Sequence, residues 1–210
     1  LTVSPGLAAE FEDRAQKVEL LYNGYDPSDL PEASTEPQEH FSLSYTGNFK
    51  PNQNVGALWQ ALKELCAENP DFANKLQLNF VGNVDPGIRS SIAEAGLERF
   101  VKDHGYQAHH YATKVMVNSS LLLFIVPQTK DNQLILTGKL FEYLGSGSPL
   151  LSIAPPNGNA AEIISSEIIT NSGSTLVNIN LKFLFPSDFS YCKSSTDNNL
   201  RLVFSGKLLC

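Results

Sequence analysis

Residues 120–126 read Ser-Leu-Leu-Leu-Phe-Ile-Val and include the longest uninterrupted apolar run of the chain. A strand of this composition is apolar on both of its alternating faces. That pattern is typical of a strand buried between two layers of helices in a parallel sheet. The stretch therefore predicts an interior strand at Ser120–Val126, followed by a polar loop over residues 127–133.

Outward from this strand, segments with strand and helix patterns alternate along the chain and are joined by short loops. Further strands are expected at Phe41–Thr46, Leu76–Val81, Arg99–Lys102 and Leu150–Ala154. Apolar residues at helical spacing predict helices at Asn54–Glu68, Pro86–Ala95, His110–Val117, Thr137–Leu144 and Ala160–Ser165. The alternation predicts an α/β fold over residues 41–170, a doubly wound parallel sheet with helices on both faces.

The two ends of the chain differ from this regular part. In residues 1–40, Ser4 and Pro5 favour a helix start, Val18–Tyr22 has a strand pattern, and prolines mark a stiff linker over residues 23–40. Because the chain opens on Leu1 and not on Met, we expect it to be a piece of a longer protein. Residues 171–210 are rich in Ser and Asn and show no sustained period, so they form a third segment.

Composition excludes several classes of function. The 210 residues carry a formal net charge of −7, and sequence-independent binding to nucleic acid needs clustered cations instead. No apolar run approaches the length of a membrane span. The three cysteines, Cys66, Cys192 and Cys210, are too few and too scattered for a disulfide framework or a zinc site, which indicates a reducing, cytosolic compartment.

Three of the expected strands are followed closely by glycine, at Gly47, Gly82 and Gly105. In an open parallel sheet, ligands bind beyond the carboxyl ends of the strands, and glycine lets the backbone approach a ligand there. Plain turn geometry explains any one of these glycines equally well. Three at equivalent strand ends favour a ligand edge.

Residues 134–151, LILTGKLFEYLGSGSPLL, are the most informative for function. A loop meets a helix start at Thr137-Gly138, where free amides and the helix dipole favour an anion, and Lys139 adds a cation. Glu142 follows three residues later on the same face, and its carboxylate suits the two hydroxyls of a ribose. Phosphate and ribose together describe a nucleotide. The alternative is a solvent-facing Lys139–Glu142 pair.

The same stretch, GKLFEYLGSGSPLL, resembles the nucleotide-binding helix of the GT-B glycosyltransferases, which have two Rossmann-like domains. Other segments agree in order: VSPGLA, NGYDPSDL, FSLSYTGNF, LNFVGNVDP, HGYQAHHYATKVMVNSSLLLFIVP and SIAPPNGNAAEII. The resemblance covers residues 2–169. It implies that residues 1–40 are the end of an acceptor domain with the interdomain linker, that residues 41–170 are the donor domain, and that residues 171–210 are a weakly matched tail.

The resemblance also implies a role for several residues. Thr137, Gly138 and Lys139 would hold the donor diphosphate, and Glu142 would hold the ribose. The base would be bordered by Gly105 and Tyr106 through their main chains. Gly47 would lie under the phosphates, and Lys50 would stand in for the basic pair that many members carry after the first strand.

The chain departs from the family pattern at the donor sugar. Many retaining members have a second glutamate eight positions before the ribose glutamate, and Leu134 occupies that position here. The contact is either missing or supplied by Asp131, Asn132 or Gln133.

Three histidines lie near the expected ligand edge. His109 and His110 could contact base or phosphate, but a helix-start residue and a solvent residue are the favoured reading, since no third ligand follows at metal spacing. His104 precedes Gly105 and could approach the ligand. Trp59 is expected in the core, and Cys66 is expected to be a packed thiol.

These features predict the donor half of a glycosyltransferase that moves a sugar from a nucleotide diphosphate sugar to a glycan or lipid-linked acceptor. The acceptor, and any peripheral membrane contact, would come through the other domain, so the isolated chain should bind nucleotide without transferring sugar. No metal cofactor is expected, because the sequence offers no carboxylate cluster for Mg²⁺. The alternatives are a nucleotide-sugar epimerase or hydrolase of the same architecture, and a degenerate nucleotide-binding module. A dehydrogenase is disfavoured, because Gly47-Asn48-Phe49-Lys50 does not match the dinucleotide fingerprint.

Overall fold

The computed structural model describes residues 1–170, so the predicted third segment, 171–210, lies outside the described residues. Their centre is a five-stranded, all-parallel sheet in the order β3-β2-β1-β4-β5. The strands are β1 (Phe41–Thr46), β2 (Leu76–Val81), β3 (Val101–Gly105), β4 (Leu121–Ile125) and β5 (Leu150–Ile153). The predicted fold class, a Rossmann-like α/β sheet, is confirmed.

Strand β4 lies in the interior of the sheet, as its composition predicts. It pairs in parallel with β1 through Leu43 and Leu121, and with β5 through Leu122 and Leu150. All five of its residues are buried. Odd residues of β4 face one apolar core and even residues face the other, which is why both faces of the strand had to be apolar.

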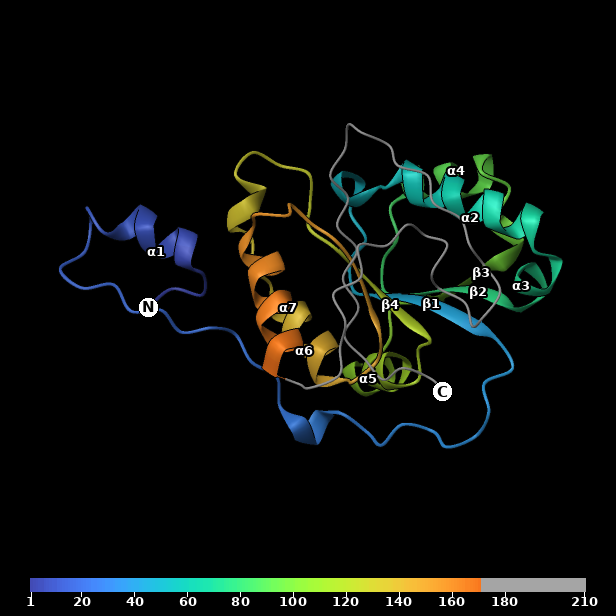
Figure 1. Cartoon of the computed structure of the whole chain (residues 1–210), viewed down its shortest axis with the longest axis horizontal. Coiled ribbons are helices and arrows are strands. Elements are labelled where there is room, and N and C mark those ends of the chain that lie inside the picture. The colour runs from blue at the N-terminus through green and yellow to red at the C-terminus, as the bar shows by residue number, and fades with distance from the viewer. Residues whose placement is uncertain (171–210) are drawn as a thin grey trace.

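Helices cover both faces of this sheet (Figure 1). One layer contains α2 (Gly56–Glu68), α3 (Pro70–Lys75) and α4 (Pro86–Glu94). The other contains α5 (His109–Val117), α6 (Gly138–Gly145) and α7 (Asn159–Thr170). Trp59 of α2 is 1% exposed and belongs to the core as expected. The Cys66 thiol packs against the same core, and burial raises its pKa. None of the described helices is long and apolar enough to cross a membrane.

One strand and one helix differ from the prediction. The third strand begins at Val101 and not at Arg99, because residues 98–100 form a 3-10 turn before it. Helix α3 was not predicted at all. Its start is nevertheless written in the sequence: Pro70 occupies the first turn and the Asn69 side chain accepts a hydrogen bond from the Phe72 amide at 3.1 Å.

The N-terminal region contains α1 (Pro5–Phe11), which is capped by Ser4 as predicted. Val18–Tyr22 is not a strand. It makes a single bridge, in which the amides of Thr2 and Leu21 donate to the carbonyls of Glu19 and Thr2 at 2.9 and 2.8 Å. A strand pattern needs a neighbouring strand to pair with, and within the described residues only Thr2 is available.

The central strand gives a direct test of the packing. Leu123 has no exposed surface, so Leu123→Ala should lower the free energy of unfolding by about 2–5 kcal/mol through lost burial and the cavity left behind. Urea unfolding followed by circular dichroism measures the change. Glu94→Ala, on the exposed side of α4, is the control and should shift stability by less than about 0.5 kcal/mol. Equal effects of the two substitutions would contradict the interior position of β4.

Candidate nucleotide site

The crossovers from β1 and β4 leave these adjacent strands toward opposite faces of the sheet. Ligands of open α/β sheets bind in the crevice outside the carboxyl ends of the strands at this kind of switch point. Here the loop after β1, residues 47–53, meets the start of α6. Most of the residues that the sequence assigns to phosphate and ribose therefore come together in one place.

The glycines at the strand ends lie side by side. The amide of Gly47 donates to the Val81 carbonyl at 2.7 Å, and the amide of Gly82 donates to the Gly105 carbonyl at 2.6 Å. Gly82 has a φ of 119°, and a Cβ there would collide with the Gly47 carbonyl. Close packing of two backbones therefore explains Gly82. Gly47, with a φ of 99°, differs because its missing Cβ leaves room for the Lys139 ammonium, which would lie only 3.2 Å from such a Cβ.

Helix α6 is attached to the end of β1 by Tyr143. The Thr46 amide donates to the buried Tyr143 hydroxyl at 2.9 Å, and the Thr46 hydroxyl lies 3.2 Å from the same oxygen. Burial raises the pKa of the Tyr143 phenol to about 12, so the group stays neutral. This attachment places the first turn of α6 beside Gly47.

Lys139 points into the crevice and not toward Glu142. Its ammonium lies 3.9 Å from the centre of the Tyr45 ring, and it forms no ion pair with Glu142 within residues 1–170. The solvent-facing pair considered as an alternative is therefore not observed. Burial lowers the pKa of Lys139 to about 7, Glu142 opposes the shift, and the charge of Lys50 adds to it. At neutral pH this lysine is partly uncharged.

Two buried side-chain polar atoms in the described part of the chain lack a hydrogen-bond partner, and both belong to the segments that follow the carboxyl ends of β1 and β4. They are the hydroxyl oxygen of Thr137, at the N-cap of α6, and the amide oxygen of Asn52. Buried polar atoms are nearly always paired in folded proteins. The Thr137 hydroxyl, beside the free amides of the first helical turn, is therefore available to a ligand.

The loop after β1 is fixed by Gln53, a residue that the sequence analysis did not single out. Its side-chain oxygen accepts from the Lys50 amide at 3.0 Å and from the Tyr45 hydroxyl at 3.2 Å. Its side-chain nitrogen donates to the Ile125 carbonyl at 3.0 Å, which ties the loop to the end of β4. Lys50 itself is exposed at the rim.

The residues assigned to the base lie at the edge strand β3. Gly105 has a φ of 61°, and its amide donates to the Asp103 carboxylate at 3.0 Å. Tyr106 follows and is 83% exposed. The strand order separates this position from α6, with β2 and β1 between them, while the row of glycines connects the two ends of the crevice.

The residues around the expected sugar contact are partly engaged elsewhere. Leu134 packs so closely on Gly6 of α1 that a Cβ on Gly6 would collide with it. Asp131 adopts the left-handed conformation with a φ of 60° before the short turn that contains Asn132. Asp131 and Gln133 are exposed, and Asn132 is half-buried.

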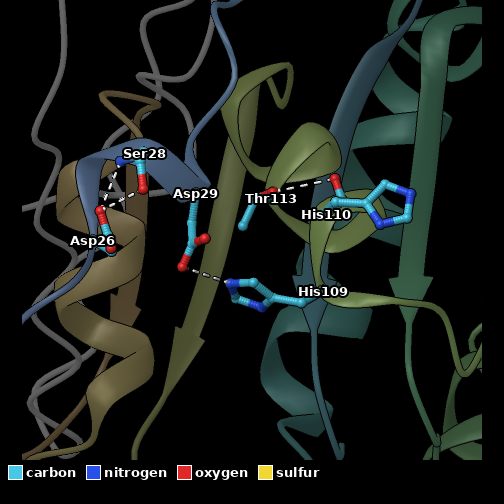
Figure 2. A network of polar contacts seen from close by, with 6 residues as sticks. All are labelled: Asp26, Ser28, Asp29, His109, His110 and Thr113. Carbon is cyan, nitrogen blue, oxygen red and sulfur yellow. Dashed lines mark hydrogen bonds and ion pairs between the residues drawn. The ribbon is translucent and has the colours of Figure 1, made fainter.

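The paired histidines, His109 and His110, are the first two residues of α5. Figure 2 shows that His109 points toward the linker, where its Nε2 lies 3.5 Å from the Asp29 carboxylate, while the His110 ring points away from it. The Thr113 hydroxyl donates to the His110 carbonyl at 3.1 Å. Among residues 1–170, no group of three or more His, Cys, Asp or Glu could hold a metal ion. These positions agree with a helix-start residue and a neighbouring surface residue.

No protein-family model matches the chain, and no curated protein matches it in sequence. Its fold does resemble solved structures. One is WaaG, a glycosyltransferase involved in lipopolysaccharide biosynthesis, with a TM-score of 0.55 at 15% identity over 78% of this chain and 46% of that one. Another is Alr3699/HepE of Anabaena in complex with UDP and glucose, with a TM-score of 0.55 at 19% identity over 76% and 45%.

Sucrose-phosphate synthase of Thermosynechococcus elongatus is similar to the same extent, with a TM-score of 0.54 at 16% identity over 80% of this chain and 48% of that one. The chain therefore has the fold of one half of a GT-B glycosyltransferase. It spans slightly less than half the length of each of these three proteins.

The attachment of α6 to β1 can be tested by removing a single oxygen atom, the Tyr143 hydroxyl. Tyr143→Phe leaves the buried Thr46 amide without its acceptor, so stability should fall by about 1–3 kcal/mol. Tyr106→Phe makes the same chemical change on an exposed ring and is the control for stability. Chemical denaturation of both variants measures the difference. Indistinguishable stabilities would show that the Tyr143 hydroxyl does not hold the helix to the strand.

Proposed function

We propose that the chain is the nucleotide-binding half of a glycosyltransferase that uses a nucleotide diphosphate sugar. The observation that carries the proposal is the start of α6. There the Lys139 side chain, whose pKa is lowered to about 7, lies beside Gly47 at the switch point of the sheet, and the unpaired Thr137 hydroxyl stands at the N-cap of the same helix. Among residues 1–170 neither group has an anionic partner, and the first helical turn offers amides and a positive dipole end to the same space.

In this proposal the diphosphate lies between Gly47 and the amides of Gly138 and Lys139, with Lys50 at the rim. Glu142, one turn along α6, accepts hydrogen bonds from the ribose hydroxyls. The base extends along the row of strand-end glycines toward Gly105 and Tyr106. The solved complex of Alr3699/HepE with UDP and glucose supports a uridine nucleotide as the first ligand to test.

Sugar transfer requires more than this half supplies. Lys139 and the helix start can stabilise the negative charge that develops on the leaving diphosphate, without a metal. An acceptor must also be held in line with the anomeric carbon while water is excluded. We assign those tasks to a partner domain that presents a glycan or lipid-linked acceptor, in the cytoplasm or at a membrane surface.

A nucleotide-binding module without transfer is the second candidate. Leu134 favours it, because this residue lies eight positions before Glu142 and packs on α1 instead of offering a polar group to a sugar. Binding of UDP with the same affinity as UDP-sugars would support the module, since the sugar then contributes no contact.

The ribose role of Glu142 can be measured by calorimetry with UDP and with GDP. Glu142→Ala removes a charged acceptor of two hydrogen bonds and should weaken binding by about 1.5–3 kcal/mol. Glu94→Ala, on α4 and exposed, changes the net charge equally and should leave the affinity unchanged. Equal affinities of the wild type and Glu142→Ala for both nucleotides would refute the assignment.

The lowered pKa of Lys139 predicts that binding takes up a proton. With a pKa of about 7 in the free chain, Lys139 is neutral in roughly half of the molecules at pH 7. A bound diphosphate raises that pKa, because a nearby negative charge favours the charged form. Affinity should therefore fall as the pH rises from 7 to 9, by at most about tenfold per pH unit. Calorimetry in buffers of different ionisation enthalpy counts the proton.

Lys139→Arg is the matched control, because a guanidinium stays charged throughout this range. This variant should bind without proton uptake and with little dependence on pH. Identical proton uptake by Lys139→Arg and the wild type would mean that another group titrates.

A further inference from the structure

A chain of polar side chains crosses the sheet on the face toward α5. The Ser119 hydroxyl lies 2.7 Å from that of Ser44, and the Asn79 side-chain amide donates to Ser44 at 3.4 Å. Asn79 in turn meets His104 of β3, and His104 meets Tyr111 of α5. Ser44 and Asn79 are buried. Such a face is ordinarily apolar in a parallel sheet, so these polar residues need a reason.

His104 is held on both ring nitrogens. Its Nε2 lies 3.4 Å from the Asn79 side-chain oxygen, and its Nδ1 lies 2.9 Å from the Tyr111 hydroxyl. These partners fit one neutral tautomer, in which Nε2–H donates to Asn79 and Nδ1 accepts from Tyr111. A protonated ring cannot accept the Tyr111 hydrogen bond.

The short connection from His104 to α5, residues 105–108, is also fixed by contacts with His104. The Gln107 side chain donates to the His104 carbonyl at 2.6 Å, and Tyr111 holds the ring from the first turn of α5. On the other side, the Gly105 amide donates to Asp103, which is paired with Arg89. The connection thus holds a glycine with positive φ and the exposed ring of Tyr106 in one arrangement.

We propose that neutral His104, through Asn79 and Tyr111, is the positioning residue that holds Gly105 and Tyr106 in the arrangement that contacts the nucleotide base. The inference rests on the proposed function, because the base contact belongs to it. His104 itself touches neither phosphate nor ribose. It acts through the connection that it anchors. Protonation of the His104 ring therefore weakens the contribution of the base contact to nucleotide affinity.

The charged groups around His104 favour the neutral ring. Burial lowers its pKa, Lys102 lowers it further, and Asp103 opposes the shift. The other titratable groups of the cavity of about 650 Å³ that His104 lines come from α5 and from the linker: His110, Tyr111, Lys114, Glu36, Glu39 and His40. Protonation of the ring therefore sets in below the ordinary range for histidine, and the base contact should weaken as the pH falls there.

The test compares UDP with inorganic pyrophosphate, which lacks a base. Titration of Lys139 and of the phosphates acts on both ligands, so the ratio of the two affinities reports on the nucleoside. The ribose contact proposed for Glu142 is the same in every variant compared, so a difference in the ratio between variants reports on the base. Calorimetry between pH 5 and 8 should show this ratio falling in acid for the wild type. Near pH 8, His104→Phe should lower the ratio about threefold to tenfold, because the hydrogen bonds of the ring to Asn79 and Tyr111 are lost. The ratio of this variant should not change with pH, and its pyrophosphate affinity should equal that of the wild type.

Further variants separate positioning from a purely structural role. Tyr111→Phe should lower the ratio in the same direction. The double variant His104→Phe/Tyr111→Phe should lose no more than His104→Phe alone, because the Tyr111 hydroxyl acts through its hydrogen bond to His104. His109→Gln is the matched control, since that ring faces Asp29 in the linker, and its ratio should follow the wild type (Figure 2).

The outcomes distinguish the two claims. Binding of both ligands with the same ratio and pH dependence in the wild type and His104→Phe would overturn the role of His104 alone. An equal loss of UDP and pyrophosphate affinity in His104→Phe would also overturn it, because a positioning residue for the base spares pyrophosphate. A wild type that binds neither ligand would overturn the proposed function, and the role of His104 with it.

Discussion

The hydrogen bond from the Thr46 amide to the Tyr143 hydroxyl fixes the relation between the sheet and α6. Thr46 is the last residue of β1, and in a parallel sheet the amides at the end of a strand need partners beyond the ladder. By supplying one from α6, the chain places a helix start next to Gly47. Lys139, in the first turn of the same helix, lies with its ammonium 3.9 Å from the centre of the Tyr45 ring.

The electrostatics of the crevice disfavour the charged form of Lys139. Lys139 is half-buried over the Tyr45 ring, with Lys50 close enough to repel it, and its pKa falls to about 7. Leaving an ammonium and a hydroxyl without anionic partners costs stability, and proteins retain such costs where a site needs them. Under the proposed function, a diphosphate would supply charge and acceptors at once, and this cost would be recovered as affinity for the ligand.

The sequence predicted features that are determined by residues close to one another in the chain. The apolar run at 120–126 requires burial on both faces and therefore an interior strand, and the glycine and lysine at 138–139 mark a helix start. Contacts between residues that are far apart in the sequence could not be predicted from it. Tyr143 finds Thr46 across 97 positions, and His104 finds Asn79 across 25. Val18–Tyr22 failed as a strand for the same reason, since its pattern is right but its pairing partner is a single residue, Thr2.

The central claim is that a nucleoside diphosphate occupies the crevice between Gly47 and the start of α6. A crystal structure of the chain grown with UDP tests it most directly, since the position of two phosphate groups is unambiguous in electron density. The account predicts phosphate oxygens within hydrogen-bond distance of the Gly138 amide and the Lys139 ammonium, with the ribose at Glu142. UDP bound elsewhere on the sheet, with the start of α6 left empty, would contradict it.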